Sequence, residues 1–333
     1  MSDAFEEMKN CRLCPRNCGA DRTRSRGFCG EGAAMRISRA ALHMWEEPVI
    51  SGSRGSGAVF FTGCNLKCIF CQNAAISDGG TGREVTPEEL ADIFFDLKEQ
   101  GAHNINLVTP SHFTPGIIEA IRLAKKRDLG LPFVWNSSGF ELAETLCKLE
   151  GLIDVYLPDY KYHSPSMPPP LVPSIPDPRD PEVRKYHAGS KEVFYSSAPG
   201  YSAWAKLAIE EMFRQVGTPV IEDGLIKRGV IVRHLVMPLG VKNACEAVDY
   251  LAETYGDDIY ISIMNQYTPL INIPGALRED QIKRLEPFPE LHRKVTKREY
   301  RRVIEHCLSL GLENVFIQEE DASGEDFIPT WDL

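Results

Sequence analysis

The chain has 333 residues, of which 43% are hydrophobic and 25% are charged, as is usual for a globular protein with a large core. Its formal net charge of −10 argues against a nucleic-acid partner. We find neither a secretory signal pattern nor an apolar run of about 18 residues, so we expect no membrane partner. Ten cysteines in such a chain favour metal binding in a reducing cytoplasm over disulfide bonds.

The N-terminal residues are rich in cysteine, arginine and glycine and follow neither helical nor strand periodicity. We predict a small metal-binding module over residues 1–45, because so short a segment needs a metal to fold. Its candidate ligands have the spacing C-x2-C-x3-C-x10-C and are Cys11, Cys14, Cys18 and Cys29. Four thiolates suit either a zinc ion or a 4Fe–4S cluster, and the spacing does not decide between them.

From about residue 55, continuous apolar runs alternate with amphipathic segments, a pattern that favours β–α units around a parallel sheet. Strands are predicted at 57–62, 104–109, 132–137, 154–158, 229–237 and 258–264, with a short seventh at 314–317. Helices are predicted at 86–100, 115–126, 141–149, 202–216, 243–255 and 296–310, the first opening on a Thr86–Glu89 capping box. The fold class is therefore α/β, with a partial (β/α)6 barrel over residues 46–320 and functional residues on the loops after the strands.

Two segments fall outside this alternation. Residues 163–198 contain eight prolines and little periodicity. We predict an insertion there, which either covers the mouth of the barrel or is a surface excursion. Residues 321–333 are predicted to form a C-terminal tail.

Three cysteines follow the first predicted barrel strand with the spacing C-x3-C-x2-C, namely Cys64, Cys68 and Cys71. Three thiolates on one short loop can hold three irons of a cubane cluster and leave the fourth open to a ligand. The alternative is a zinc site or buried structural thiols, but closed zinc sites commonly take four protein ligands. The pattern therefore favours an iron–sulfur cluster with an open iron. The remaining cysteines, Cys147, Cys245 and Cys307, lie on predicted helices and are expected to be core thiols.

The stretch from Glu46 to Asn73 resembles the radical S-adenosylmethionine (SAM) superfamily, and within it proteins similar to the pyruvate formate-lyase activating enzyme. The segment Cys-x2-Cys-Pro-Arg-x-Cys-Gly resembles one subgroup of these. Further similar stretches are 106–112, 136–141, 154–161, 233–238, 264–267 and 311–314.

The resemblance implies an oxidoreductase in which a 4Fe–4S cluster on Cys64, Cys68 and Cys71 reductively cleaves SAM. The resulting 5′-deoxyadenosyl radical would take hydrogen from a substrate, and similarity to activating enzymes implies a protein or peptide. Implied partners are a flavodoxin- or ferredoxin-type electron donor and that substrate, in an anaerobic setting. The N-terminal cysteines would then hold a second 4Fe–4S cluster or zinc.

The resemblance also implies which side chains bind SAM. Phe70 occupies a position that packs near adenine, although simple shielding of the cluster is the alternative. At 109–112 the sequence departs from the superfamily's usual Gly-Gly-Glu, so contacts with the SAM amino group would come from hydroxyls or carbonyls there. Arg233 and His234 point in opposite directions on one strand, and we expect one of them to face the site. The implied set is Phe70, Asn73, Thr109, Ser111, Asn136, Ser137, Asp159, Lys161, Arg233 and His234.

Two other functions remain open at this point. The enzyme could act on a small molecule, or the chain could be an iron–sulfur electron-transfer protein without SAM turnover. Hydrolase functions are not favoured, because no phosphate-binding G-x-x-x-x-G-K-[ST] loop and no H-E-x-x-H pattern is present.

Overall fold

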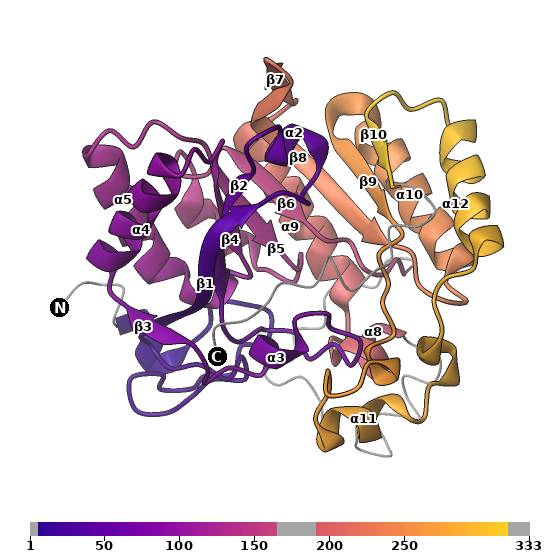
Figure 1. Ribbon diagram of the computed structural model, residues 1–333, viewed down its shortest axis with the longest axis horizontal. Helices are drawn as coiled ribbons and strands as arrows, with labels where there is room; N and C mark the ends of the chain where they lie inside the picture. The colour runs from indigo at the N-terminus through magenta and orange to yellow at the C-terminus, as the bar shows by residue number, and fades with distance from the viewer. Residues whose placement is uncertain (1–5, 165–190, 319–333) are drawn as a thin grey trace.

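The computed structural model describes residues 6–164 and 191–318 (Figure 1). Most of the predicted insertion and the predicted tail lie outside the described residues. Within the described part, the sheet has the strand order β10-β9-β8-β6-β5-β4-β2-β1-β3, and β7 pairs with β8. The sheet therefore runs from β3 at one edge to β10 at the other.

All seven predicted strands are confirmed, and they pair in parallel with one another. They are β2 (Ser56–Phe61), β4 (Ile105–Val108), β5 (Phe133–Ser137), β6 (Val155–Pro158), β8 (Leu225–Leu235), β9 (Tyr260–Met264) and β10 (Val315–Ile317). Every residue of β2, β4, β5 and β6 is buried. Burial on both faces explains why their sequences are continuous apolar runs rather than alternating ones.

Three antiparallel strands were not predicted: β1 (Met35–His43), β3 (Arg83–Val85) and β7 (Val220–Glu222). They pair with β2, β1 and β8 respectively. Because β3 and β7 have three residues each and β1 carries arginines and a serine, no apolar run marked them. β1 lies inside the predicted 1–45 module, so the sheet continues across that predicted boundary.

The long helices are α4 (Pro87–Glu99), α5 (Thr114–Lys126), α9 (Tyr201–Val216), α10 (Val241–Tyr255) and α12 (Lys297–Ser309). They flank the sheet on its outer side, α4 and α5 beside β4 and α10 and α12 beside β9 (Figure 1). The predicted capping box of α4 is confirmed, since Thr86 Oγ1 accepts a bond from the Glu89 amide at 3.2 Å. These helices bury the outer face of the strands.

The remaining helical elements are short. They are α2 (Pro48–Ser51), α3 (Ala74–Ser77), α6 (Ala143–Leu146), α8 (Lys191–Ser196) and α11 (Glu279–Leu285), with 3-10 turns at Met8–Asn10, Ser111–Phe113, Cys147–Leu149, Gly256–Asp258, Leu270–Asn272 and Pro289–His292. The helix predicted at 141–149 is thus α6 followed by a 3-10 turn. The prediction of a core thiol was wrong for Cys147, which is exposed because this turn lies at the surface, whereas Cys307 is buried.

The interior of the barrel is layered. At the amino ends of the strands, Ile50 of α2 packs against Val134, Val155 and Ile231 and closes the barrel with apolar side chains. The carboxyl ends of the parallel strands lie at the opposite edge, where α3 follows β2 at the bottom of Figure 1. The sheet topology confirms the predicted fold class, an α/β partial barrel. None of the helices within the described ranges has the length and apolar character to cross a membrane.

Candidate functional site

The loop after β2 carries the three-cysteine motif. Gly63 turns the chain with a φ of 76°, and Cys64, Cys68 and Cys71 follow as free thiols. Two amides fold the end of the loop, Cys71 N to Cys68 O at 3.3 Å and Ala74 N to Cys71 O at 3.1 Å, and lead it into α3. All three thiol-bearing residues line one cavity of about 210 Å³ inside the barrel.

The chemistry of these thiols suits a cluster of soft metal ions. Burial raises the pKa of Cys68 to about 11 and that of Cys71 to about 12. Without a metal they therefore stay protonated at neutral pH, and iron binding would displace the protons. In the described part of the chain, no three His, Cys, Asp or Glu side chains converge on the position of a single ion. Three thiols that line one cavity suit a cubane cluster with an open iron, whereas closed zinc sites commonly take four protein ligands.

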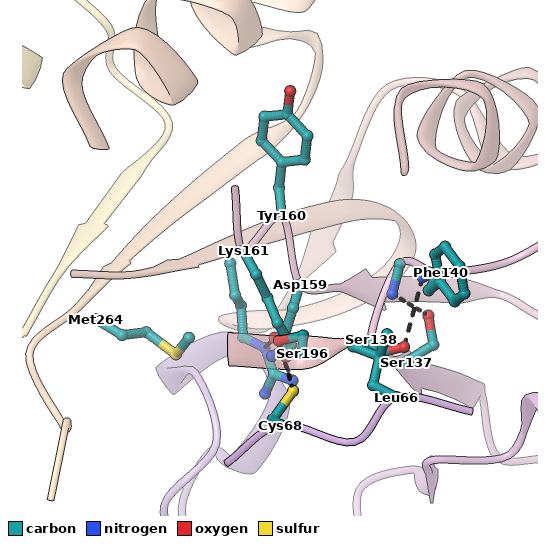
Figure 2. A network of polar contacts seen from close by, with 12 residues as sticks. Leu66, Cys68, Ser137, Ser138, Phe140, Asp159, Tyr160, Lys161, Ser196 and Met264 are labelled. Atoms are coloured by element: carbon teal, nitrogen blue, oxygen red, sulfur yellow. Dashed lines mark hydrogen bonds and ion pairs between the residues drawn. The ribbon is translucent and has the colours of Figure 1, made fainter. Parts of the chain in front are cut away.

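Polar side chains from the ends of neighbouring strands line the same cavity. Figure 2 shows Asp159 and Lys161, which follow β6, gathered near Cys68 and Ser196, while Tyr160 points away from them. The Cys68 Sγ lies 2.9 Å from Ser196 Oγ. The predicted residues that line the cavity are Cys64, Cys68, Phe70, Cys71, Asn73, Thr109, Asn136, Ser137, Asp159, Lys161 and Arg233.

Arg233 of β8 is the centre of a buried polar layer. Its Nε donates to Asp159 Oδ1 at 2.9 Å, and its two terminal nitrogens reach Glu46 Oε2 at 3.1 Å and Asn136 Oδ1 at 2.6 Å. Lys161 pairs with the other Asp159 oxygen. The layer lies between the apolar floor of the barrel and the cysteine loop. Its polar groups come from strands β5 and β8, from the end of β6 and from Glu46, and line the cavity.

The charges of this layer support one another. Burial acts to raise the pKa of Asp159, but Arg233 and Lys161 outweigh it and hold that pKa below its usual value. For Lys161, burial acts to lower the pKa and Asp159 outweighs it, so the net direction is upward. Both groups are therefore ionised at neutral pH, and the cavity presents fixed charges of both signs to a ligand.

Residues 58–166 match the family model described as the Radical SAM superfamily. This match covers about a third of the chain, which is similar to the superfamily over that part. The matched residues run from β2 through the cysteine motif to the Asp159–Lys161 pair. Similarity to this superfamily implies a 4Fe–4S cluster and SAM as cofactors.

Other similarities are more distant. An uncharacterised protein of Methanocaldococcus jannaschii is 27% identical over 316 residues, which cover 92% of this chain and 77% of the relative. The structure of Streptococcus suis SuiB bound to S-adenosylmethionine matches at 12% identity and a TM-score of 0.47, covering 77% of this chain and 48% of SuiB. The structure of native anSMEcpe with bound AdoMet matches at 12% identity and a TM-score of 0.45, covering 77% and 61%. The chain spans about half the length of the SuiB structures that it matches.

Two of the predicted SAM contacts do not line the cavity. Ser111 is buried and donates to Glu141 Oε1 at 2.7 Å. His234 is buried with its Nδ1 2.7 Å from the Tyr160 carbonyl oxygen. Because neighbouring side chains on a strand point to opposite faces, His234 faces outward and Arg233 is the member of the pair that faces the site.

Several cavity residues were missed from the sequence. They include His43, at the end of β1, and Trp45 and Glu46, in the connection between β1 and α2. Glu46 Oε1 accepts bonds from Asn106 at 3.2 Å and Asn136 at 3.1 Å, in addition to its contact with Arg233. The only signal was the resemblance that begins at Glu46, because β1 itself was not predicted.

The four N-terminal cysteines also lie close together. Cys11, Cys14 and Cys29 are buried, and Cys18 is exposed. A hydrogen bond with Cys11 lowers the pKa of Cys18 to about 5, and the charge of Cys18 acts on Cys14 and Cys29 as well. A Cβ on Gly27 would lie 3.5 Å from Cys29 Sγ and 3.6 Å from Cys18 Sγ. By their chemistry, four thiolates suit either metal that the sequence left open, although no three of them converge on the position of a single ion in the described part of the chain.

Proposed function

We propose that the protein is a radical SAM enzyme in which Cys64, Cys68 and Cys71 hold a 4Fe–4S cluster. When bound, that cluster would supply one electron that breaks the C5′–S bond of SAM and yields methionine and a 5′-deoxyadenosyl radical, which abstracts a hydrogen atom from a substrate. The observation that carries the proposal is the shared cavity: three thiols and a fixed layer of opposite charges line the same space. The amino-acid moiety of SAM is zwitterionic, and each of its two charges would find a partner there.

The chain's own side chains would bind and orient SAM. Lys161 is suited to its carboxylate, while Asp159 is suited to its amino group or a ribose hydroxyl. Arg233 holds Asp159 and Asn136 in place from below. Phe70 lies edge-on to Tyr267 and Tyr195, at ring-centroid distances of 6.3 and 6.4 Å, and so belongs to an aromatic wall against which an adenine can pack.

We further propose that the substrate is a protein or peptide, as in the activating enzymes that the sequence resembles. Trp45 supports this proposal, because it lines the cavity and yet is 59% exposed. A large aromatic side chain at an opening suits a chain that lies across the rim and inserts one residue. A small molecule held wholly inside the cavity would not need Trp45.

The test is anaerobic reconstitution with iron and sulfide, followed by SAM and dithionite. We expect 5′-deoxyadenosine and methionine in equal amounts by mass spectrometry. Cys71→Ala should lose both the cluster absorbance and the cleavage, whereas Cys147→Ala, an exposed cysteine outside the site, should keep both. Absence of 5′-deoxyadenosine from fully reconstituted wild type would refute the enzyme and leave an electron-transfer protein.

A Trp45→Ala variant tests the role of Trp45 in binding a peptide substrate. With a peptide substrate, we expect weaker substrate binding and little change in the slow SAM cleavage that occurs without substrate. An unchanged KM for a peptide substrate in this variant would contradict the role given to Trp45.

A further inference from the structure

The distribution of charge singles out the N-terminal module. Residues 9–30 contain six basic residues and one acidic residue, a net of +5, which leaves −15 for the other 311 residues. Arg12, Arg24 and Arg26 are exposed, as is 40% of Phe28. We call these four residues the basic face. Gly27 lies between Arg26 and Phe28 in the chain, and a Cβ at Gly27 would lie 3.6 Å from the Sγ of the exposed Cys18.

A backbone hydrogen bond joins this module to the three-cysteine loop. The amide of Cys64 donates to the carbonyl oxygen of Cys29 at 3.1 Å. The neighbouring Gly63 permits this approach, because a Cβ there would lie 2.7 Å from the same carbonyl and 2.6 Å from Glu31 Cγ. A candidate ligand of one cysteine set is thus connected to a candidate ligand of the other through backbone and one hydrogen bond.

Arg16 makes a second connection. It is buried, its Nε donates to the Asn65 carbonyl at 2.6 Å, and its guanidinium also contacts the carbonyls of Ser196 and Ser197. Ser196 in turn touches the Cys68 thiol. The cation therefore lies between the two sets of cysteines. It stacks 3.9 Å from the ring centre of Phe28, a member of the basic face.

We propose that the N-terminal module binds a second 4Fe–4S cluster on Cys11, Cys14, Cys18 and Cys29. An acidic electron-donor protein would dock on the basic face and reduce this cluster first. The electron would then pass to the cluster at Cys64, Cys68 and Cys71. The inference rests on the proposed function, since it supplies the electron that SAM cleavage consumes. Zinc has no redox chemistry, so a zinc ion at this site could not pass an electron along the connection.

The electron balance is simple. A low-potential donor of the flavodoxin or ferredoxin class would lose one electron, which the N-terminal cluster would accept and pass on without net change. Cys29 and Cys64 would connect the two sets of thiols, and the electron would be consumed in breaking the C5′–S bond of SAM. The exposed Cys18 would hold the N-terminal cluster near the surface, and the basic face would steer an acidic partner toward it.

The first measurement is the metal content. We expect about eight iron and eight sulfide per wild-type chain, and about four in a Cys11→Ala/Cys14→Ala variant, as two cubanes and one cubane require. Electron paramagnetic resonance of the reduced Cys71→Ala variant should still show one 4Fe–4S cluster. One zinc and about four iron per wild-type chain would overturn the proposal.

The second measurement compares two reductants. A purified bacterial flavodoxin, reduced photochemically, and dithionite are each mixed with the protein, and loss of visible cluster absorbance is followed. In an Arg24→Glu/Arg26→Glu variant, we expect the flavodoxin rate divided by the dithionite rate to fall by about tenfold or more. The matched control is Arg122→Glu/Lys126→Glu, with the same charge change at exposed positions near the end of α5. This surface variant keeps the test available if the double alanine variant does not fold.

The outcomes separate this inference from the proposed function. If flavodoxin reduces both clusters through the basic face and SAM is not cleaved, the relay stands and the enzyme proposal falls. If SAM is cleaved but the N-terminal site holds zinc, the relay falls and the enzyme stands. Equal rate ratios in the two charge-reversal variants would also overturn docking on the basic face.

Discussion

At the scale of single residues, the barrel keeps charged groups where most proteins would place apolar ones. Arg233, Asp159 and Glu46 are largely buried and form one network. Burying ion pairs costs desolvation energy, and replacement by apolar residues is often neutral or stabilising. A buried network is therefore weak evidence for stability. Its position directly beneath the cysteine loop favours a role in binding a charged ligand.

Glu47 gives the residue-scale prediction, on the pH dependence of stability. It is buried, one carboxylate oxygen has no partner, and burial raises its pKa from 4.5 to about 7. Between those values the native state holds a proton that the unfolded state has lost, so the free energy of unfolding falls as pH rises through this window. Glu47→Gln removes this loss. The difference in unfolding free energy, Glu47→Gln minus wild type, should therefore increase between pH 4.5 and pH 7 by on the order of 2 kcal/mol. Urea denaturation of both proteins at each pH measures this difference.

The matched control for Glu47 is Glu253→Gln, an exposed carboxylate on α10. We expect its stability difference from wild type to stay flat over the same pH range. A Glu47→Gln difference that is equally flat would contradict a raised pKa at this position.

At the scale of elements, what the sequence could predict follows from burial. Strands covered on both faces, such as β5 and β6, are continuous apolar runs, and α4 carries a capping box, so both kinds of element were predicted within a few residues. β1 was missed because its exposure alternates irregularly and its two arginines interrupt any apolar pattern. Such a strand is specified by its neighbours β2 and β3 more than by its own composition.

Whether a residue of the candidate site could be predicted depended on whether the element next to it was predicted. Residues at the ends of predicted strands, such as Asn136 and Asp159, were expected in the cavity because the fold places strand ends together. Glu46 follows β1, so missing that strand also hid this residue. Ser111 lies outside the cavity lining, because a 3-10 turn, which leaves no periodic signal in the sequence, directs its hydroxyl toward Glu141.

Gly63 gives the element-scale prediction. Gly63→Ala places a Cβ against Cys29 O and Glu31 Cγ in a left-handed backbone conformation. We expect a loss of unfolding free energy of about 1 kcal/mol from the backbone and about 2 kcal/mol more from the clash. Denaturation with urea, followed by fluorescence, measures the total.

Gly151→Ala is the matched comparison for Gly63. Its φ of 73° is nearly the same, but nothing lies within 4 Å of the added Cβ. It should show the backbone cost alone, about 1 kcal/mol. Equal losses in the two variants would mean that the module and the cysteine loop move apart without cost.

At the scale of the whole molecule, the loop from Cys64 to Cys71 is held from two distant parts of the chain. The N-terminal module contacts it through Cys29 and Arg16. The segment around α8 contacts it through the carbonyls of Tyr195 and Ser196, which accept bonds from Ile69 and Lys67. Arg16 joins these two supports to each other. Order in the loop thus depends on contacts between segments up to about 180 residues apart in sequence.

Arg16→Gln tests this dependence. Loss of the guanidinium leaves buried carbonyls at Asn65, Ser196 and Ser197 without their donor, at a cost of about 1.5–3 kcal/mol for a charged bond. We expect amide hydrogen exchange at residues 64–71 to accelerate by about tenfold or more, while α10 and α12 stay as protected as in wild type. Arg298→Gln, at an exposed position of α12, should change neither region.

Faster exchange throughout the Arg16→Gln chain would mean global destabilisation. Unchanged exchange at 64–71 would mean that the α8 segment alone orders the loop, because its backbone bonds are then sufficient without the buried cation.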